Sequence, residues 1–158
     1  MGREEQPADR ALALARALPP RLRLGAAALS LRLRLGGLLR RRSLPVLLGA
    51  IDARSTPAAR VPLSTALGAL DDAQALLSRL RLGRFVPDTC LYRSLARYSI
   101  LRRAGHPARF VMGLRPSEPE ILGHAWVELD GAPVGETVDP ALVVTFAYPD
   151  RAAPSAPR

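Results

Sequence analysis

The spacing of apolar residues changes once along this chain, after the run "RRAG" that ends at Gly105. Before it, leucines recur three or four positions apart, which predicts helices, the clearest of them at residues 64–82. After it, residues 108–115 and 124–129 have the short amphipathic pattern of strands. Helices followed by an antiparallel sheet predict an α+β fold.

Local signals set the expected limits of the later elements. Asp88 or Thr89 can cap a second helix, whose last turn is the cationic "RR" before the terminal glycine. Asp130 and Gly131 predict a hairpin turn, with "APVGETV" as the returning strand. Residues 141–148 are a fourth strand candidate.

The first part of the chain has a different composition. Residues 8–42 are mostly Leu, Ala and Arg, and the breakers "PP" at Pro19 and "GG" at Gly36 predict short helices with interruptions. The run "LRLRL" alternates like a strand, but its residue types favour a helix. We therefore expect a helical region at residues 1–60, a core at residues 61–148 and a disordered tail at residues 149–158.

The net charge of +9 comes from arginine alone, because the sequence contains no lysine. Arginine suits nucleic acid, an anionic membrane surface or an acidic peptide, since its planar fork pairs with phosphate or carboxylate. An aromatic content of 4% leaves few rings to stack on bases, which disfavours nucleic acid. The arginine-rich helices fit precursor or partner docking and also contact with a membrane surface.

The single cysteine excludes an internal disulfide and a cysteine-rich zinc site. The two histidines are not at ligand spacing, so we expect no metal and no cofactor. No apolar run approaches the roughly 20 residues of a membrane span, and "MGREEQPADR" is too acidic for the start of a signal peptide. These features predict a cytoplasmic protein.

Cys90 stands at the expected start of the helix that follows Pro87. Unpaired N–H groups and the helix dipole favour negative charge there, so the position suits a reactive thiolate, and the same groups can hold an oxyanion. The alternative is a small buried apolar side chain with no chemical role.

His124 opens a strand after Gly123, where it can act as the base for a cysteine nucleophile. Its orienting carboxylate depends on the hairpin. A two-residue turn places His124 opposite Thr137 and brings Asp139 to its face, whereas a three-residue loop places Glu136 opposite His124. Glu128 shares that face, and we interpret it as a solvated or substrate-facing carboxylate. Trp126, two residues beyond the histidine, is expected to pack or to shield the site from water.

Two stretches, "DTCLYRSLARYSILRRAGHPARFVMGLR" and "GHAWVELDGAPVGETVDP", resemble the transglutaminase-like cysteine peptidases of lasso-peptide biosynthesis. These enzymes remove the leader from a ribosomally made precursor. The resemblance covers roughly Pro87 to Pro140 and implies a papain-like core with a helix-borne cysteine packed on an antiparallel sheet. It implies Cys90 as nucleophile and His124 as base.

The resemblance also implies partners, and it bears on which carboxylate orients His124. Precursor binding would involve the N-terminal part, a small leader-recognition protein and a cyclase. The family's hairpin spacing favours Glu136 over Asp139, although Gly135 stands where relatives carry a polar residue. The predicted function is leader removal through a thioester. Acyl transfer and a peptide-binding scaffold without catalysis are the alternatives.

Overall fold

The computed structural model describes residues 18–55, 60–82, 85–116 and 121–150. In this part of the chain, four helices precede a four-stranded sheet: α2 Pro20–Arg41, α3 Leu44–Ala53, α4 Leu63–Arg79, α5 Cys90–Arg103, β1 Arg109–Pro116, β2 Ile121–Leu129, β3 Ala132–Pro133 and β4 Val143–Tyr148. The strand order is β3-β2-β1-β4 and each neighbouring pair is antiparallel. The predicted α+β class is confirmed, and the cysteine lies in a helix as expected.

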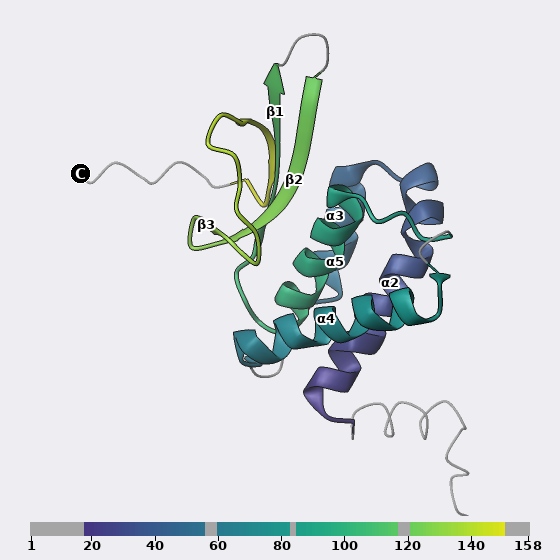
Figure 1. Cartoon of the computed structure of the whole chain (residues 1–158). Coiled ribbons are helices and arrows are strands. Elements are labelled where there is room, and N and C mark those ends of the chain that lie inside the picture. The colour runs from purple at the N-terminus through teal and green to yellow at the C-terminus, as the bar shows by residue number, and fades with distance from the viewer. Residues whose placement is uncertain (1–17, 56–59, 83–84, 117–120, 151–158) are drawn as a thin grey trace, which may run out of the picture.

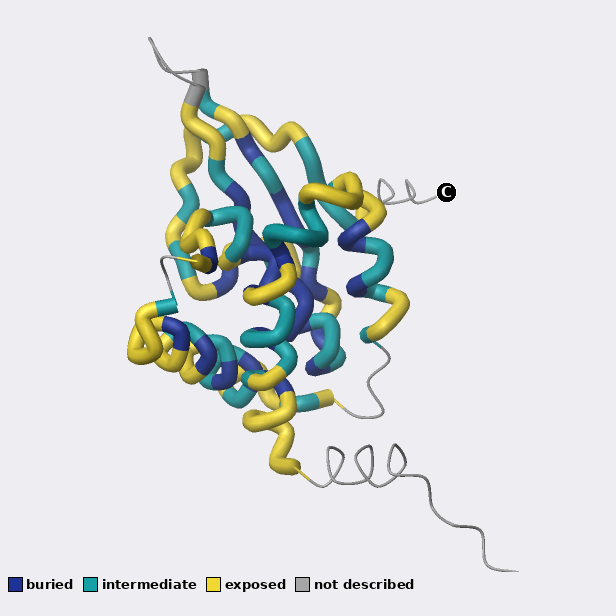
Figure 2. The backbone as a smooth tube through the Cα atoms, turned by 90° about the vertical axis from the view of Figure 1, so that its right-hand side faces the viewer, coloured by how far each residue is buried: buried dark blue, intermediate teal, exposed yellow. Residues whose placement is uncertain are grey.

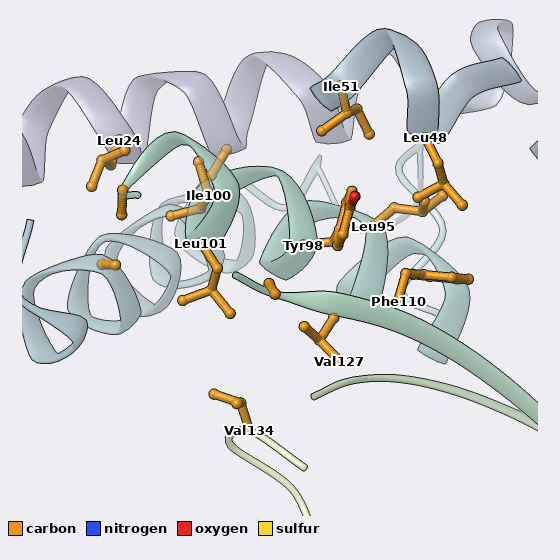
Figure 3. Packing of buried hydrophobic residues seen from close by; sticks show 14 of the residues in the cluster. Leu24, Leu48, Ile51, Leu95, Tyr98, Ile100, Leu101, Phe110, Val127 and Val134 are labelled. Carbon is orange, nitrogen blue, oxygen red and sulfur yellow. The ribbon is translucent and has the colours of Figure 1, made fainter. Parts of the chain in front are cut away.

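Helix α5 occupies the centre of the molecule. It contacts β1 and β2 on one side and α2, α3 and α4 on the other (Figure 1). Figure 3 shows its apolar side chains packed between residues of the outer helices and residues of the sheet. The largest fully buried members of this helix are Leu95, Tyr98, Ile100 and Leu101.

Tyr98 fixes α5 to α3. Its hydroxyl donates a 2.8 Å hydrogen bond to Asp52 Oδ1, which also accepts from Arg102 Nε at 2.8 Å. Its ring meets Phe110 of β1 and Tyr148 of β4 edge-on, at centroid distances of 6.4 and 6.2 Å. Burial, and then the bond to Asp52, raise the pKa of Tyr98 well above its ordinary value, so the hydroxyl remains a donor.

The predicted helix break at "GG" does not occur, whereas a helix does begin at the predicted "PP" break. Helix α2 begins at Pro20 and continues through Gly36 and Gly37 to Arg41, and "LRLRL" is helical within it. The pair Gly36 and Gly37 costs about 2 kcal/mol of helix propensity relative to two alanines. Packing outweighs that cost, because Leu24, Ala28 and Leu35 are buried in the same hydrophobic cluster as α5.

Helix α4 is confirmed, but a different set of side chains faces the core. The leucine spacing predicted the helix, whereas its buried residues are mainly alanines, and Leu80 just after the helix is 58% exposed. Small side chains permit the close approach of α4 to α2. Figure 2 shows the contrast between the exposed outer helices and the buried centre of the molecule.

The returning strand is shorter than predicted. Only Ala132–Pro133 pair with β2, and the segment that follows is not a strand, although "APVGETV" was expected to be one throughout. The fourth strand, β4, is confirmed at Val143–Tyr148.

The predicted disordered tail lies outside the described residues from residue 151 onward, as do residues 1–17 of the predicted helical region. None of the helices in the described ranges is long and apolar enough to span a membrane.

Candidate active site

Cys90 is the first residue of α5. Thr89 is the N-cap, and its hydroxyl accepts from the Tyr92 N–H at 3.5 Å. The thiol is free and partly buried. The sulfur therefore stands beside the unpaired first N–H groups of the helix, where negative charge is favoured.

A buried arginine of α2 holds the segment just before the cysteine. Arg32 is 6% exposed, and its Nη2 donates to Asp88 Oδ1 at 2.9 Å and to the Pro87 carbonyl at 3.5 Å. Gln74 of α4 reaches the other oxygen of Asp88 at 3.4 Å. Two outer helices thus fix the start of α5, and with it the position of Cys90.

His124 lies on β2, opposite Gly113 of β1. The next residue anchors the strand to α5, because Ser94 Oγ donates a buried 2.7 Å hydrogen bond to the Ala125 carbonyl. His124 Nε2 and Glu136 Oε2 are 2.7 Å apart. A carboxylate partner makes Nε2 the donor, which leaves Nδ1 free to accept a proton.

The structure brings Glu136, not Asp139, to the histidine. The hairpin has the two-residue turn, with Leu129 opposite Ala132, and a regular ladder from that turn would favour Asp139. The ladder instead ends after the Val134 N–H bonds to the Val127 carbonyl at 2.9 Å. Gly135 then adopts a φ of +71°, which redirects the chain and carries Glu136 to His124.

Asp139 is engaged elsewhere. It accepts a 2.7 Å hydrogen bond from Arg115 Nη1 and caps the turn through the Ala141 N–H at 2.9 Å. Asp139, Arg115 and His124 line an open groove of about 270 Å³ on the sheet face that bears the histidine. Asp139 therefore borders the site without contacting the histidine.

Sequence reasoning missed Arg97. Its guanidinium pairs with Glu136 Oε1, while Glu136 Oε2 faces His124, so one carboxylate bridges the arginine cation and the imidazole. Arg97 is 18% exposed and Glu136 23% exposed at the side chain. A usable signal was present, because residues 90, 94 and 97 are spaced to share one face of a helix.

These side chains surround one small cavity. Its volume is about 130 Å³, and its lining consists of Cys90, Arg93, Ser94, Arg97, His124, Gly135 and Glu136. The thiol, the imidazole and the carboxylate come from α5, β2 and the segment after β3. A cavity of this size admits a reacting carbonyl and its nearest atoms, so the bulk of a larger substrate has to lie outside it.

Trp126 and Glu128 form a second layer behind the histidine. The rings of His124 and Trp126 are nearly parallel, with 13° between their planes and 6.0 Å between centroids. The indole is 3% exposed and donates to Glu128 Oε1 at 3.0 Å, and Arg109 Nη1 reaches Glu128 Oε2 at 3.4 Å. The carboxylate that we interpreted as solvated or substrate-facing instead holds the tryptophan in place.

The other histidine is far from this cavity. His106 follows the opposite end of α5, is buried, and lies 2.9 Å from the Val61 carbonyl through Nε2. It serves to join the chain after α5 to the segment before α4. Within the described ranges, no group of three or more His, Cys, Asp or Glu side chains is placed to hold a metal ion.

A cysteine at a helix start, a histidine that retains a free ring nitrogen and a carboxylate that orients that histidine can carry out acyl transfer through a thioester. Comparison with known proteins agrees with this chemistry. The profile described as "Transglutaminase-like superfamily" matches residues 25–147, which include α3, α4, α5, β1, β2, β3 and all but the last residue of β4. No curated protein and no solved structure matches the chain. Because the family match covers most of its length, the chain belongs to the transglutaminase-like superfamily.

Proposed function

We propose that this protein is a cysteine peptidase that removes the leader from a ribosomally made precursor peptide of the lasso type. The superfamily fits either peptidase or acyl transferase activity. The observation that carries the proposal is the cavity shared by Cys90, His124 and Glu136. The resemblance of residues 87–140 to lasso leader peptidases supplies the substrate class.

In the proposed reaction, His124 Nδ1 takes the thiol proton of Cys90, and the thiolate attacks the carbonyl carbon of the scissile amide. A carbon–sulfur bond forms, and the carbonyl electrons move to oxygen as an oxyanion beside the first N–H groups of α5. When the oxyanion collapses, the carbon–nitrogen bond breaks. The protonated His124 delivers its proton to the leaving amine.

Release of the leader completes the cycle. The thioester joins Cys90 to the end of the leader, and His124 accepts a proton from water as the water oxygen attacks that carbonyl. The carbon–sulfur bond breaks, the leader leaves as a free acid and the thiol is restored. Glu136 acts in both halves, because its negative charge stabilises the imidazolium and its hydrogen bond keeps Nδ1 directed to the reaction.

An acyl transferase would share the first half of this reaction and end the thioester with an amine in place of water. The superfamily match supports this second function equally well. The masses of the products separate the two. Hydrolysis yields two peptides whose masses sum to the precursor plus one water, whereas crosslinking at a glutamine side chain loses ammonia and joins two molecules.

The direct test is intact mass spectrometry of a precursor peptide encoded beside this gene, incubated with the protein and with the small leader-recognition protein of the same cluster. We expect cleavage at one site by the wild type. Cys90→Ala should leave the precursor intact while retaining the wild-type circular dichroism spectrum. Trimming by Cys90→Ala, or no change of any mass with the wild type, would overturn the proposal, and the second outcome would favour a binding scaffold.

A further inference from the structure

A larger cavity lies away from the candidate site, between α2, α3 and the C-terminal end of α5. Its volume is about 440 Å³, which is within the range of ligand-binding pockets. Four of its lining residues are arginines, contributed by three helix segments: Arg34, Arg42, Arg54 and Arg103.

No carboxylate of the described residues balances these charges. Other arginines of the same helices form ion pairs, such as Arg102 with Asp52 and Arg21 with Asp72. None of the four cavity arginines takes part in an ion pair within the described ranges. The cavity therefore concentrates positive charge in a concave space, where a negative ligand is attracted most strongly.

Arg103 shows the cost of this arrangement. Its Nε is buried without a hydrogen-bond partner. Burial, and then the nearby charge of Arg54, lower the pKa of the Arg103 guanidinium from its ordinary value. Arg42, Arg54 and Arg103 each stand at a helix C-terminus, where the dipole offsets part of the charge. An anion would supply the missing hydrogen-bond acceptors.

The floor of the cavity is apolar. Between the arginines lie aliphatic side chains of α2 and α3, and two serine hydroxyls complete the lining: Leu31, Leu38, Leu47, Ile51, Ser30 and Ser99. A free phosphate compound would satisfy the arginines and leave the aliphatic floor uncovered. A peptide with carboxylates and aliphatic side chains would satisfy both.

We infer that this cavity binds an acidic segment of the peptide substrate that also carries aliphatic side chains, at a distance from the bond that is cut. The inference rests on the proposed function. Cys90 and Arg103 are the first and last residues of the 14-residue helix α5, which places them about 20 Å apart. An extended chain needs about six residues to cover that distance. The acidic segment therefore lies at least about six residues from the scissile bond.

The test is a binding measurement that needs no cleavage. A short fluorescein-labelled peptide that alternates glutamate pairs with leucine is titrated with the full-length protein, and its fluorescence anisotropy is followed. The matched control peptide has glutamine in place of every glutamate. The protein variants are Arg34→Gln combined with Arg54→Gln, both exposed positions, and Arg41→Gln as an exposed α2 position outside the cavity.

We expect the glutamate peptide to bind and the glutamine peptide to bind at least about tenfold more weakly. The double variant should weaken binding by about tenfold or more, and Arg41→Gln by less than about twofold. Equal loss in Arg41→Gln and in the double variant would overturn the inference, because it would show only the general charge of the protein. Displacement of the peptide by sodium triphosphate at micromolar concentration would overturn it in favour of a phosphate ligand.

The outcome is independent of catalysis. Cys90→Ala should bind the glutamate peptide as the wild type does, since Cys90 does not line this cavity. Binding that depends on Arg34 and Arg54, together with no cleavage of any precursor, would retain the acidic-peptide site and reject the peptidase. Cleavage that is unaffected by the double variant, with no peptide binding, would retain the peptidase and reject the site.

Discussion

Glu136 joins two side chains that sequence places far apart: one of its carboxylate oxygens lies 2.7 Å from His124 Nε2, and the other pairs with Arg97. The bridge connects β2 to α5 through a segment that belongs to neither. It fixes the imidazole relative to the helix that carries Cys90.

Glu136→Gln should lower kcat by at least about 100-fold, because a neutral amide cannot stabilise the imidazolium that forms during attack. Asp139→Asn is the matched control and should change kcat by less than about threefold, since Asp139 pairs with Arg115. Initial rates of precursor cleavage by chromatography measure both. A larger loss in Asp139→Asn would assign the orienting role to Asp139.

Arg97→Met should lower kcat by about tenfold and leave KM within about twofold, because Arg97 acts on Glu136 and not on the substrate. Arg97→Lys should recover part of the loss, since it restores a cation beside the carboxylate. In a Glu136→Gln background, Arg97→Met should add little, which a double-mutant cycle would show as strong coupling. Additive losses would contradict a role through Glu136.

Cys90 should react with iodoacetamide at neutral pH at least about tenfold faster than a simple thiol such as glutathione. His124→Ala should remove most of this acceleration, because the imidazole is the group placed to take the thiol proton. The chain has one cysteine, so a single adduct in the intact mass reports the rate. An ordinary rate that is insensitive to His124 would support the scaffold alternative.

Gly135→Ala should destabilise the protein by about 1–2 kcal/mol, because alanine resists a φ of +71° and its Cβ would lie 3.3 Å from Arg97 Nη2. Gly37→Ala is the opposite case, since a Cβ there meets nothing within 4 Å, and helix propensity should stabilise the protein by up to about 1 kcal/mol. Urea unfolding midpoints compare the two. Equal shifts in one direction would contradict the explanation.

The two glycine sites also show where sequence reasoning succeeds and where it does not. Local propensity identified α5, its N-cap and the order of helices before strands. It predicted a break at Gly36 that does not occur. The helix propensity lost at Gly36 and Gly37 is smaller than the free energy gained by burying Leu24, Ala28 and Leu35. That balance depends on packing partners distant in sequence, which a local pattern does not contain.

The choice between Glu136 and Asp139 also depended on a feature that a local sequence pattern does not contain, which is the point where the β2–β3 ladder ends. Sequence alternation linked the candidates to the length of the turn, and this link failed because it assumed a ladder that continued past Pro133. The ladder ends at Gly135, which adopts a positive φ. A glycine permits this conformation, but its presence in the sequence does not show that the conformation is adopted. Arg97 was missed for a simpler reason: the interval from Cys90 places it on the nucleophile's face, but with 23 arginines in the chain the residue type alone did not distinguish it.

Helix α5 precedes every strand of the described residues, so the nucleophile is synthesised before its base and before the carboxylate that orients the base. A chain still emerging from the ribosome therefore carries Cys90 without His124 or Glu136 and has the chemistry of an ordinary thiol. The cavity that contains all three side chains forms only when β2 and the segment after β3 are in place beside α5. The complete set of Cys90, His124 and Glu136 is therefore a property of the assembled helix and sheet, and not of the helix alone.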